Sequence, residues 1–251
     1  ISITTMTPMK TQLFFRAGLL TILLTALVAP ASADGIGPRN RSLEHFVVAQ
    51  DLSAWGGGVY GRDGDREVGV LGFDDQSLET RKGGVYLSYD ILRWLTAYAT
   101  AAGGEYGLKE YDDGTSSGDL EWGLGVQIGL LDQPIMDPFL MEDRLRLDAN
   151  LYVTRVDTEL MNRDVDWFEY QGSLVLSIVN ELWGAEAFFP KAMTLYVGPA
   201  FSNMSGDDID EEDVFGGVGG LHLWLTPSVS CDIGVDYFGE AALTGALHLR
   251  F

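Results

Sequence analysis

The sequence has little cysteine, little positive charge and few long apolar runs. Its 251 residues contain one cysteine, Cys231, which excludes an internal disulfide and a metal site built from several cysteines. Lysine and arginine number 16 against 37 acidic residues, for a formal net charge of −21. A surface of this sign repels nucleic acid. After residue 33 no stretch reaches the roughly 18 apolar residues of a membrane-spanning helix.

The N-terminal segment has the three parts of a secretory signal peptide. Lys10 and Arg16 supply positive charge, residues 17–28 are apolar, and residues 31–33 read Ala-Ser-Ala, as before a cleavage site. The apolar part is about a dozen residues long, whereas a membrane-spanning helix needs about 20. We therefore predict that residues 1–33 are a cleaved signal peptide with residues upstream of the true start.

Strict alternation of apolar and polar residues dominates the rest of the chain. Between Arg144 and Val153 every second residue is apolar and the others are charged or polar. A period of two indicates a strand with one apolar face. The segments with this pattern are 53–63, 81–90, 94–106, 118–130, 143–157, 167–180, 193–203, 214–226, 229–238 and 242–251. The pattern predicts an all-β fold, a closed antiparallel up-and-down barrel of about 10 strands, with 8 as the alternative.

The connections between these segments fall into two groups. Residues 90–93 and 226–228 are short turns at one end, and the polar residues 112–117 and 205–212 are longer loops at the other. This division is typical of up-and-down barrels that cross a membrane. Residues 132–142 and 181–192 are long and apolar for turns, and we expect their aromatic residues at a membrane interface.

The C-terminal strand carries a family resemblance. Gly245, Leu247, Leu249 and the terminal Phe251 lie at alternate positions. This resembles the C-terminal signature of bacterial outer-membrane β-barrels, which in that family is recognised by the barrel-assembly machinery. The chain is similar to the small barrels that include opacity-type and outer-membrane-protein-A-type domains, and no motif assigns a subfamily.

The resemblance implies export through the inner membrane and a place in the outer membrane. Residues 34–52 would then be a short periplasmic segment and residues 53–251 the barrel, in contact with lipid and lipopolysaccharide. A secreted soluble barrel or sandwich is the alternative fold, since it would share the signal peptide and the alternation. It leaves the strand that ends at Phe251 without an explanation.

The polar residues that alternate with the apolar face are predicted to point into the lumen. They are Glu121, Gln127, Arg144, Arg146, Asp148, Asn150, Glu169, Gln171, His222, Asp232, Asp236, His248 and Arg250. A barrel of about eight strands is only wide enough for side chains to fill. We expect a charged, largely filled lumen and a structural or surface-interaction role.

A narrow porin-like channel for ions or small solutes is the alternative function. Its selectivity elements would be three lumenal arginines opposite three acids. These are Arg144, Arg146 and Arg250, opposite Glu121, Glu169 and Asp232.

A lipid-modifying enzyme is the third candidate. Such an enzyme needs a serine activated by a histidine. None of His45, His222 and His248 lies in a His-x-Ser pattern, although a triad assembled from separate strands stays open. We predict no catalytic residues, and no cofactor is implied.

An acidic run and the single cysteine are the remaining candidates for chemistry. Residues 207–213 are rich in carboxylates but lack the spacing of a calcium loop, so we expect a solvated loop and no metal site. If this run binds a divalent cation, a bridge to lipopolysaccharide phosphates is the expected form. Cys231 lies on an apolar face, and we assign it no role.

Overall fold

The computed structural model describes residues 53–70, 73–109, 116–135, 143–160, 163–181, 190–207, 209–211 and 213–251. The predicted signal peptide, residues 34–52 and much of the connections 132–142 and 181–192 lie outside these ranges. In the described part of the chain, no helix has the length and apolar character needed to cross a membrane.

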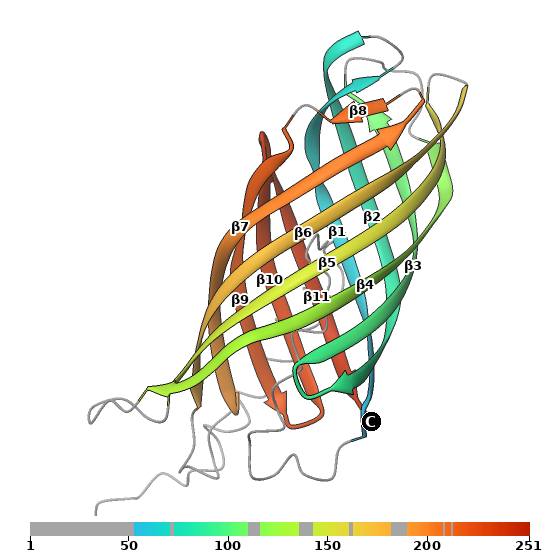
Figure 1. Ribbon diagram of the computed structural model, residues 1–251. Helices are drawn as coiled ribbons and strands as arrows, with labels where there is room; N and C mark the ends of the chain where they lie inside the picture. The colour runs from blue at the N-terminus through green and yellow to red at the C-terminus, as the bar shows by residue number, and fades with distance from the viewer. Residues whose placement is uncertain are drawn as a thin grey trace, which may run out of the picture. The chain divides into compact units, whose positions relative to one another are not determined.

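The described residues form eleven antiparallel strands in one sheet. The strands are β1 (Trp55–Val70), β2 (Phe73–Leu92), β3 (Leu95–Leu108), β4 (Ser116–Ile135), β5 (Asp143–Leu160), β6 (Arg163–Glu181), β7 (Ala192–Gly206), β8 (Ile209–Glu211), β9 (Phe215–Thr226), β10 (Val229–Phe238) and β11 (Glu240–Arg250). Apart from β8, strands that are neighbours in sequence pair with each other, and β11 pairs with β1 from Gly56↔Arg250 to Gly64↔Ala242. The sheet is therefore a closed barrel (Figure 1).

The prediction of a closed barrel of about ten strands is confirmed. Each predicted segment corresponds to one of β1–β7 or β9–β11, extending at most two residues beyond the observed strand. The sandwich alternative is excluded because the sheet closes on itself. Several strands are longer than predicted: β1 continues to Val70, β2 begins at Phe73 and β6 at Arg163. In the extensions of β1 and β6 the outward side chains, such as Glu67 and Asp164, are no longer apolar. The alternation used for prediction therefore ends before the strand does.

The short strand β8 was not predicted, and it changes how the barrel closes. Strand β1 pairs with β11 along Gly56–Gly64 but with β8 along Val68–Val70. In the same way, β7 pairs with β9 up to Phe201 and with β8 at Ser205. Among the described residues, the wall thus closes through β1–β8 at this end, which we call the β8 end (Figure 1). At the β8 end the described part of the wall is therefore made of strands β1 to β8, without β9, β10 and β11. Because a barrel of fewer strands is narrower, the barrel narrows toward this end.

The prediction that residues 205–212 form a loop is therefore wrong for most of this segment. Ser205 and Gly206 belong to β7, and Ile209–Glu211 form β8. The physical reason is Ile209, an aliphatic residue within the acidic run, whose side chain is 1% exposed. Its burial inside the barrel holds the run against the wall.

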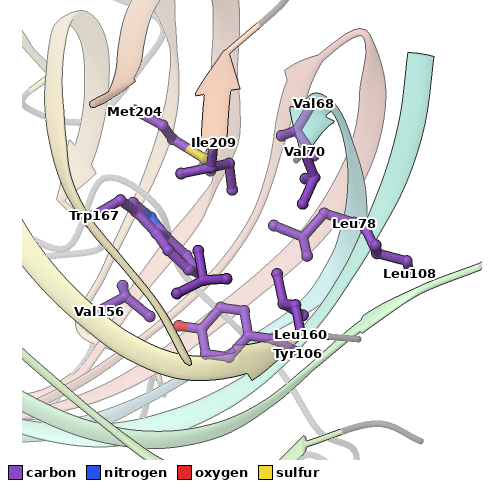
Figure 2. Packing of buried hydrophobic residues seen from close by; sticks show 11 residues of the cluster. Val68, Val70, Leu78, Tyr106, Leu108, Val156, Leu160, Trp167, Met204 and Ile209 are labelled. Atoms are coloured by element: carbon purple, nitrogen blue, oxygen red, sulfur yellow. The ribbon is translucent and has the colours of Figure 1, made fainter. Parts of the chain in front are cut away.

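Apolar side chains fill the interior of the β8 end. The members of this cluster, which we call the inner apolar core, are Val68, Val70, Leu78, Tyr106, Leu108, Val156, Leu160, Val165, Trp167, Met204 and Ile209. Figure 2 shows Ile209 and Met204 close to Val68, Val70 and Leu78, with Trp167 and Tyr106 completing the core. Ile209 and Val70 are neighbours on the paired strands β8 and β1. The outer side of this end is charged, with ion pairs such as Arg81–Asp63.

The polarity is reversed toward the other end of the barrel, which we call the C-terminal end. There the exposed outer side chains are aliphatic and 41% to 65% exposed, and we call them the outer belt: Val59, Val85, Leu87, Leu124, Leu151, Leu174, Leu176, Ile178, Leu195, Val197, Ile233, Val235 and Leu243. Exposed aromatic residues lie near the strand ends on either side of this belt, Trp55, Tyr89 and Phe251 on one side and Phe215 and Tyr237 on the other. The same strands are thus apolar outside here and apolar inside at the β8 end.

Candidate functional site in the barrel interior

The interior behind the outer belt is polar. Ten residues of the predicted lumenal set are buried: Glu121, Gln127, Arg146, Glu169, Gln171, His222, Asp232, Asp236, His248 and Arg250. The other three, Arg144, Asp148 and Asn150, are half-buried. Six of these side chains belong to two groups at different heights in the barrel.

The first group is an ionic layer beneath the inner apolar core. Its members are Arg62, Arg66, Lys82, Glu121, Glu169 and Asp236. Arg62 pairs with Asp236 at 3.2 Å, Lys82 pairs with Glu121 at 2.8 Å, and Arg66 pairs with Glu169. All six side chains are at most 5% exposed, and three cations face three anions, so the layer is electrically neutral.

Further hydrogen bonds hold the two glutamates of this layer. Glu169 Oε1 accepts from Gln171 Nε2 at 2.6 Å and from Ser202 Oγ at 3.0 Å, in addition to Arg66. Glu121 Oε2 accepts from the hydroxyl of Tyr106 at 2.8 Å. A buried ion pair is tolerated only when such hydrogen bonds satisfy its remaining lone pairs and protons.

The cations of the ionic layer were missed by the sequence reasoning. Arg62 and Lys82 lie within the predicted segments 53–63 and 81–90, and Arg66 lies just beyond the first of them, but none of the three was placed in the lumenal set. The alternation could have identified two of them. Arg62 and Arg66 lie at even positions of β1, on the same inward face as the buried Tyr60 and Val68.

The structure also gives the three predicted lumenal arginines other partners. Arg144 and Arg146 both reach Asp132, at 2.8 Å and 3.5 Å, and Arg250 pairs with Asp90. Neither aspartate was among the predicted residues. A register shift in β4 between Gly129 and Leu131 precedes Asp132. Alternation counted from the start of the strand therefore assigns Asp132 to the outer face, whereas its side chain lies inside the barrel.

The second group is a histidine layer at the C-terminal end of the interior, made of His222, His248, Trp224, Tyr86 and Asp232. The ring of His222 stacks on Trp224 with centroids 4.1 Å apart and on His248 with centroids 5.2 Å apart. The Tyr86 hydroxyl lies 2.5 Å from His248 Nδ1, and Asp232 Oδ2 lies 3.8 Å from His222 Nδ1.

Two small cavities lie between the side chains of the interior. A cavity of about 40 Å³ is lined by Gln127, Arg146, Thr194, Tyr196, His222, Trp224 and neighbouring residues. Another of about 10 Å³ lies near Gln171 and Phe238. One buried water needs about 10–15 Å³. These cavities therefore hold a few waters and are too small for a solute.

The remaining predicted residues lie in the wall. Gly245, Leu247 and Leu249 pair with Gly61, Val59 and Gly57, so the C-terminal signature residues form the seam that closes the barrel. Phe251 is 62% exposed. Cys231 is a half-buried free thiol in β10. Across the ranges that the structure describes, no three His, Cys, Asp or Glu side chains are placed to hold a metal ion.

Comparisons with known proteins find likenesses among solved structures alone. No family model and no curated protein matches the chain. Neisserial surface protein A is 13% identical, over 80% of this chain and 99% of that chain, with a TM-score of 0.37. An outer membrane channel from Pseudomonas putida F1 is 12% identical over 80% and 96%, with a TM-score of 0.40.

A third likeness is to the transport unit of the autotransporter AIDA-I from Escherichia coli. It is 11% identical over 84% of this chain and 94% of that chain, with a TM-score of 0.42. Sequence identities and TM-scores this low assign the chain to no family. The fold is established by the chain's own strand pairings, as a closed antiparallel barrel of ten long strands in the described residues, with the short β8 at one end.

Proposed function

We propose that this chain spans a bacterial outer membrane as a sealed barrel with a structural or surface-interaction role. The observation that carries the proposal is the reversal of polarity along the strands. Behind the outer belt the interior is charged, whereas at the β8 end the interior is apolar and the outside is charged. A barrel that crosses a bilayer and then emerges into water needs both arrangements.

The outer belt supports membrane insertion. Soluble monomers rarely expose apolar patches larger than a few hundred Å². Outer-membrane barrels instead carry an apolar band about 25 Å tall between girdles of aromatic residues. On this proposal the belt contacts lipid and lipopolysaccharide, and the closing strand with Leu249 and Phe251 is the segment that the barrel-assembly machinery recognises.

The strand lengths support a part that projects beyond the bilayer. A tilted strand crosses the hydrocarbon with about 9–11 residues. Here β2 and β4 have 20 residues each and β6 has 19. In β2 and β6 the excess lies at the β8 end, where charged side chains such as Arg81 of β2 and Asp166 of β6 point outward. This rigid, charged rim is the surface that a partner outside the cell would meet.

The interior contacts favour a sealed barrel over a channel. A permeant ion would have to part the ion pairs of the ionic layer and then cross the inner apolar core, which offers it few polar groups in exchange for its hydration. The cavities of about 40 Å³ and 10 Å³ do not provide that route. The catalytic alternative has no observation in its favour.

The first test measures conductance. The protein, inserted in planar bilayers, is expected to produce no discrete current steps, while the same preparation floats with liposomes on a density gradient. Current steps from the unmodified protein would replace the sealed barrel with the narrow channel. Protein that folds but does not float would overturn the membrane proposal.

The second test compares two arginine substitutions on the outer face of β5. Leu151 belongs to the outer belt, and Glu159 lies on the same face near the β8 end of that strand. Leu151→Arg is expected to lower the free energy of unfolding in lipid by about 2–4 kcal/mol, the cost of arginine at mid-bilayer. Glu159→Arg should change it by about 0.5 kcal/mol or less, as at an ordinary exposed site. Urea titration of vesicle-inserted protein measures both, and equal effects would contradict the assigned bilayer position.

A further inference from the structure

Two buried imidazoles face each other in the histidine layer. His222 and His248 are 1% and 2% exposed, and their rings are stacked with an interplanar angle of 17°. They come from β9 and β11, on either side of β10, which supplies Asp232 between them. This arrangement plays no part in the proposed sealing of the barrel.

The groups around the pair limit how much positive charge it can hold. A buried charge is stable only when it is paired and hydrogen-bonded. Asp232 is 6% exposed, approaches His222, and accepts a hydrogen bond from the Tyr196 hydroxyl at 2.9 Å. The charged or titratable groups facing the pair are Tyr86 and Asp90 of β2, Arg146 and Asp148 of β5, Tyr196 of β7, Asp232 of β10 and Arg250 of β11.

The fixed charges of this part of the interior leave one acid in excess. Among the described interior residues of the C-terminal end there are three arginines and four aspartates: Arg144, Arg146 and Arg250, with Asp90, Asp132, Asp148 and Asp232. With both histidines neutral the region carries one negative charge. A single imidazolium neutralises it, whereas a second would add an unbalanced charge within 5.2 Å of the first, between ring centroids.

We propose that His222 and His248 form one proton-binding site that takes up a single proton, held against Asp232. The proton comes from solvent and binds a ring nitrogen of either imidazole, and no covalent bond to carbon changes. Histidine is the side chain that ordinarily gains a proton between pH 8 and 5. The pair then acts as one unit, as expected for strongly interacting sites. The interior of the C-terminal end thus changes charge once in this range, while the neutral ionic layer does not.

The experiment records the ring nitrogen chemical shifts of the protein labelled with ¹⁵N in its histidines, in detergent micelles, at pH 8 and pH 5. The His45→Gln variant removes the signal of the third histidine in the sequence. At pH 8 both remaining rings are expected to be neutral. At pH 5 the pair is expected to show one proton's worth of imidazolium, on one ring or averaged over both. Two full imidazoliums, or none, at pH 5 would overturn the proposal.

Variants test the role of Asp232 separately. Asp232→Asn is expected to abolish proton uptake by the pair at pH 5, whereas Asp63→Asn, on the outer side of β1, leaves it unchanged. A circular dichroism spectrum equal to that of the unmodified protein shows that each variant is folded. Uptake that survives Asp232→Asn in folded protein would contradict the assigned counter-ion. Fluorescence of Trp224, obtained by difference from Trp224→Phe, should fall as His222 beside it becomes cationic.

Discussion

Replacing Glu169 with alanine is expected to lower the free energy of unfolding by about 3–5 kcal/mol. The carboxylate is buried and binds Arg66, Gln171 and Ser202 at once. Removing it takes away the carboxylate that pairs with the Arg66 guanidinium, which is 2% exposed. The loss is large because that ion pair no longer offsets the desolvation of a buried cation.

Urea unfolding followed by intrinsic fluorescence in lipid vesicles measures this loss. The matched control is Glu79→Ala, because Glu79 forms a 3.9 Å pair with Arg81 in which both side chains are exposed. Exposed pairs contribute about 0–1 kcal/mol. A Glu169→Ala loss as small as that of the control would show that the ionic layer is hydrated and not a seal.

A double substitution separates the pair from its packing. Arg66→Met combined with Glu169→Leu removes both charges and keeps apolar volume, so it is expected to recover most of the stability that Glu169→Ala loses. Buried ion pairs replaced in this way are often neutral or more stable. If the double variant is no more stable than the single one, the polar contacts of Gln171 and Ser202 decide the stability of the layer.

Replacing Ile209 with aspartate is expected to detach β8 from the wall. Ile209 is 1% exposed and packs in the inner apolar core with Met204 and Trp167. Truncating a buried isoleucine to alanine costs about 2–5 kcal/mol. Burying a carboxylate there costs more, and because β8 has three residues, it is the element that yields.

Hydrogen exchange at the backbone amide of Gly69 reports this detachment. β1 pairs with β8 along Val68–Val70, and because alternate amides of an antiparallel strand face opposite neighbours, Gly69 faces β8 while Val68 and Val70 face β2. Exchange should accelerate at least about tenfold, which corresponds to about 1.4 kcal/mol of lost protection. Asp207→Ala, an exposed position just before β8, is the control and should leave exchange unchanged. Unaltered exchange in Ile209→Asp would mean that β8 is held by its backbone pairing and not by its side chain.

The interior contacts show where prediction from pattern stopped. Alternation placed Glu121, Glu169 and Asp236 at positions that the structure buries, because side-chain direction in a strand depends only on odd or even position. It could not supply their partners, since Lys82 and Glu121 meet between β2 and β4, strands that do not pair with each other. Register shifts, such as the one in β4 before Asp132, also break the count of odd and even positions.

The sequence by itself determined the all-β class, the ten long strands and the closing strand that ends beside Phe251, because each depends on a local period of two and on turn residues. The tertiary structure alone decided which charges pair, that His222 stacks on His248, and that β8 closes the wall between β1 and β7. These features join residues far apart in the chain, such as Arg66 and Glu169. They depend on how the strands are staggered where the barrel closes, and local alternation does not record that stagger.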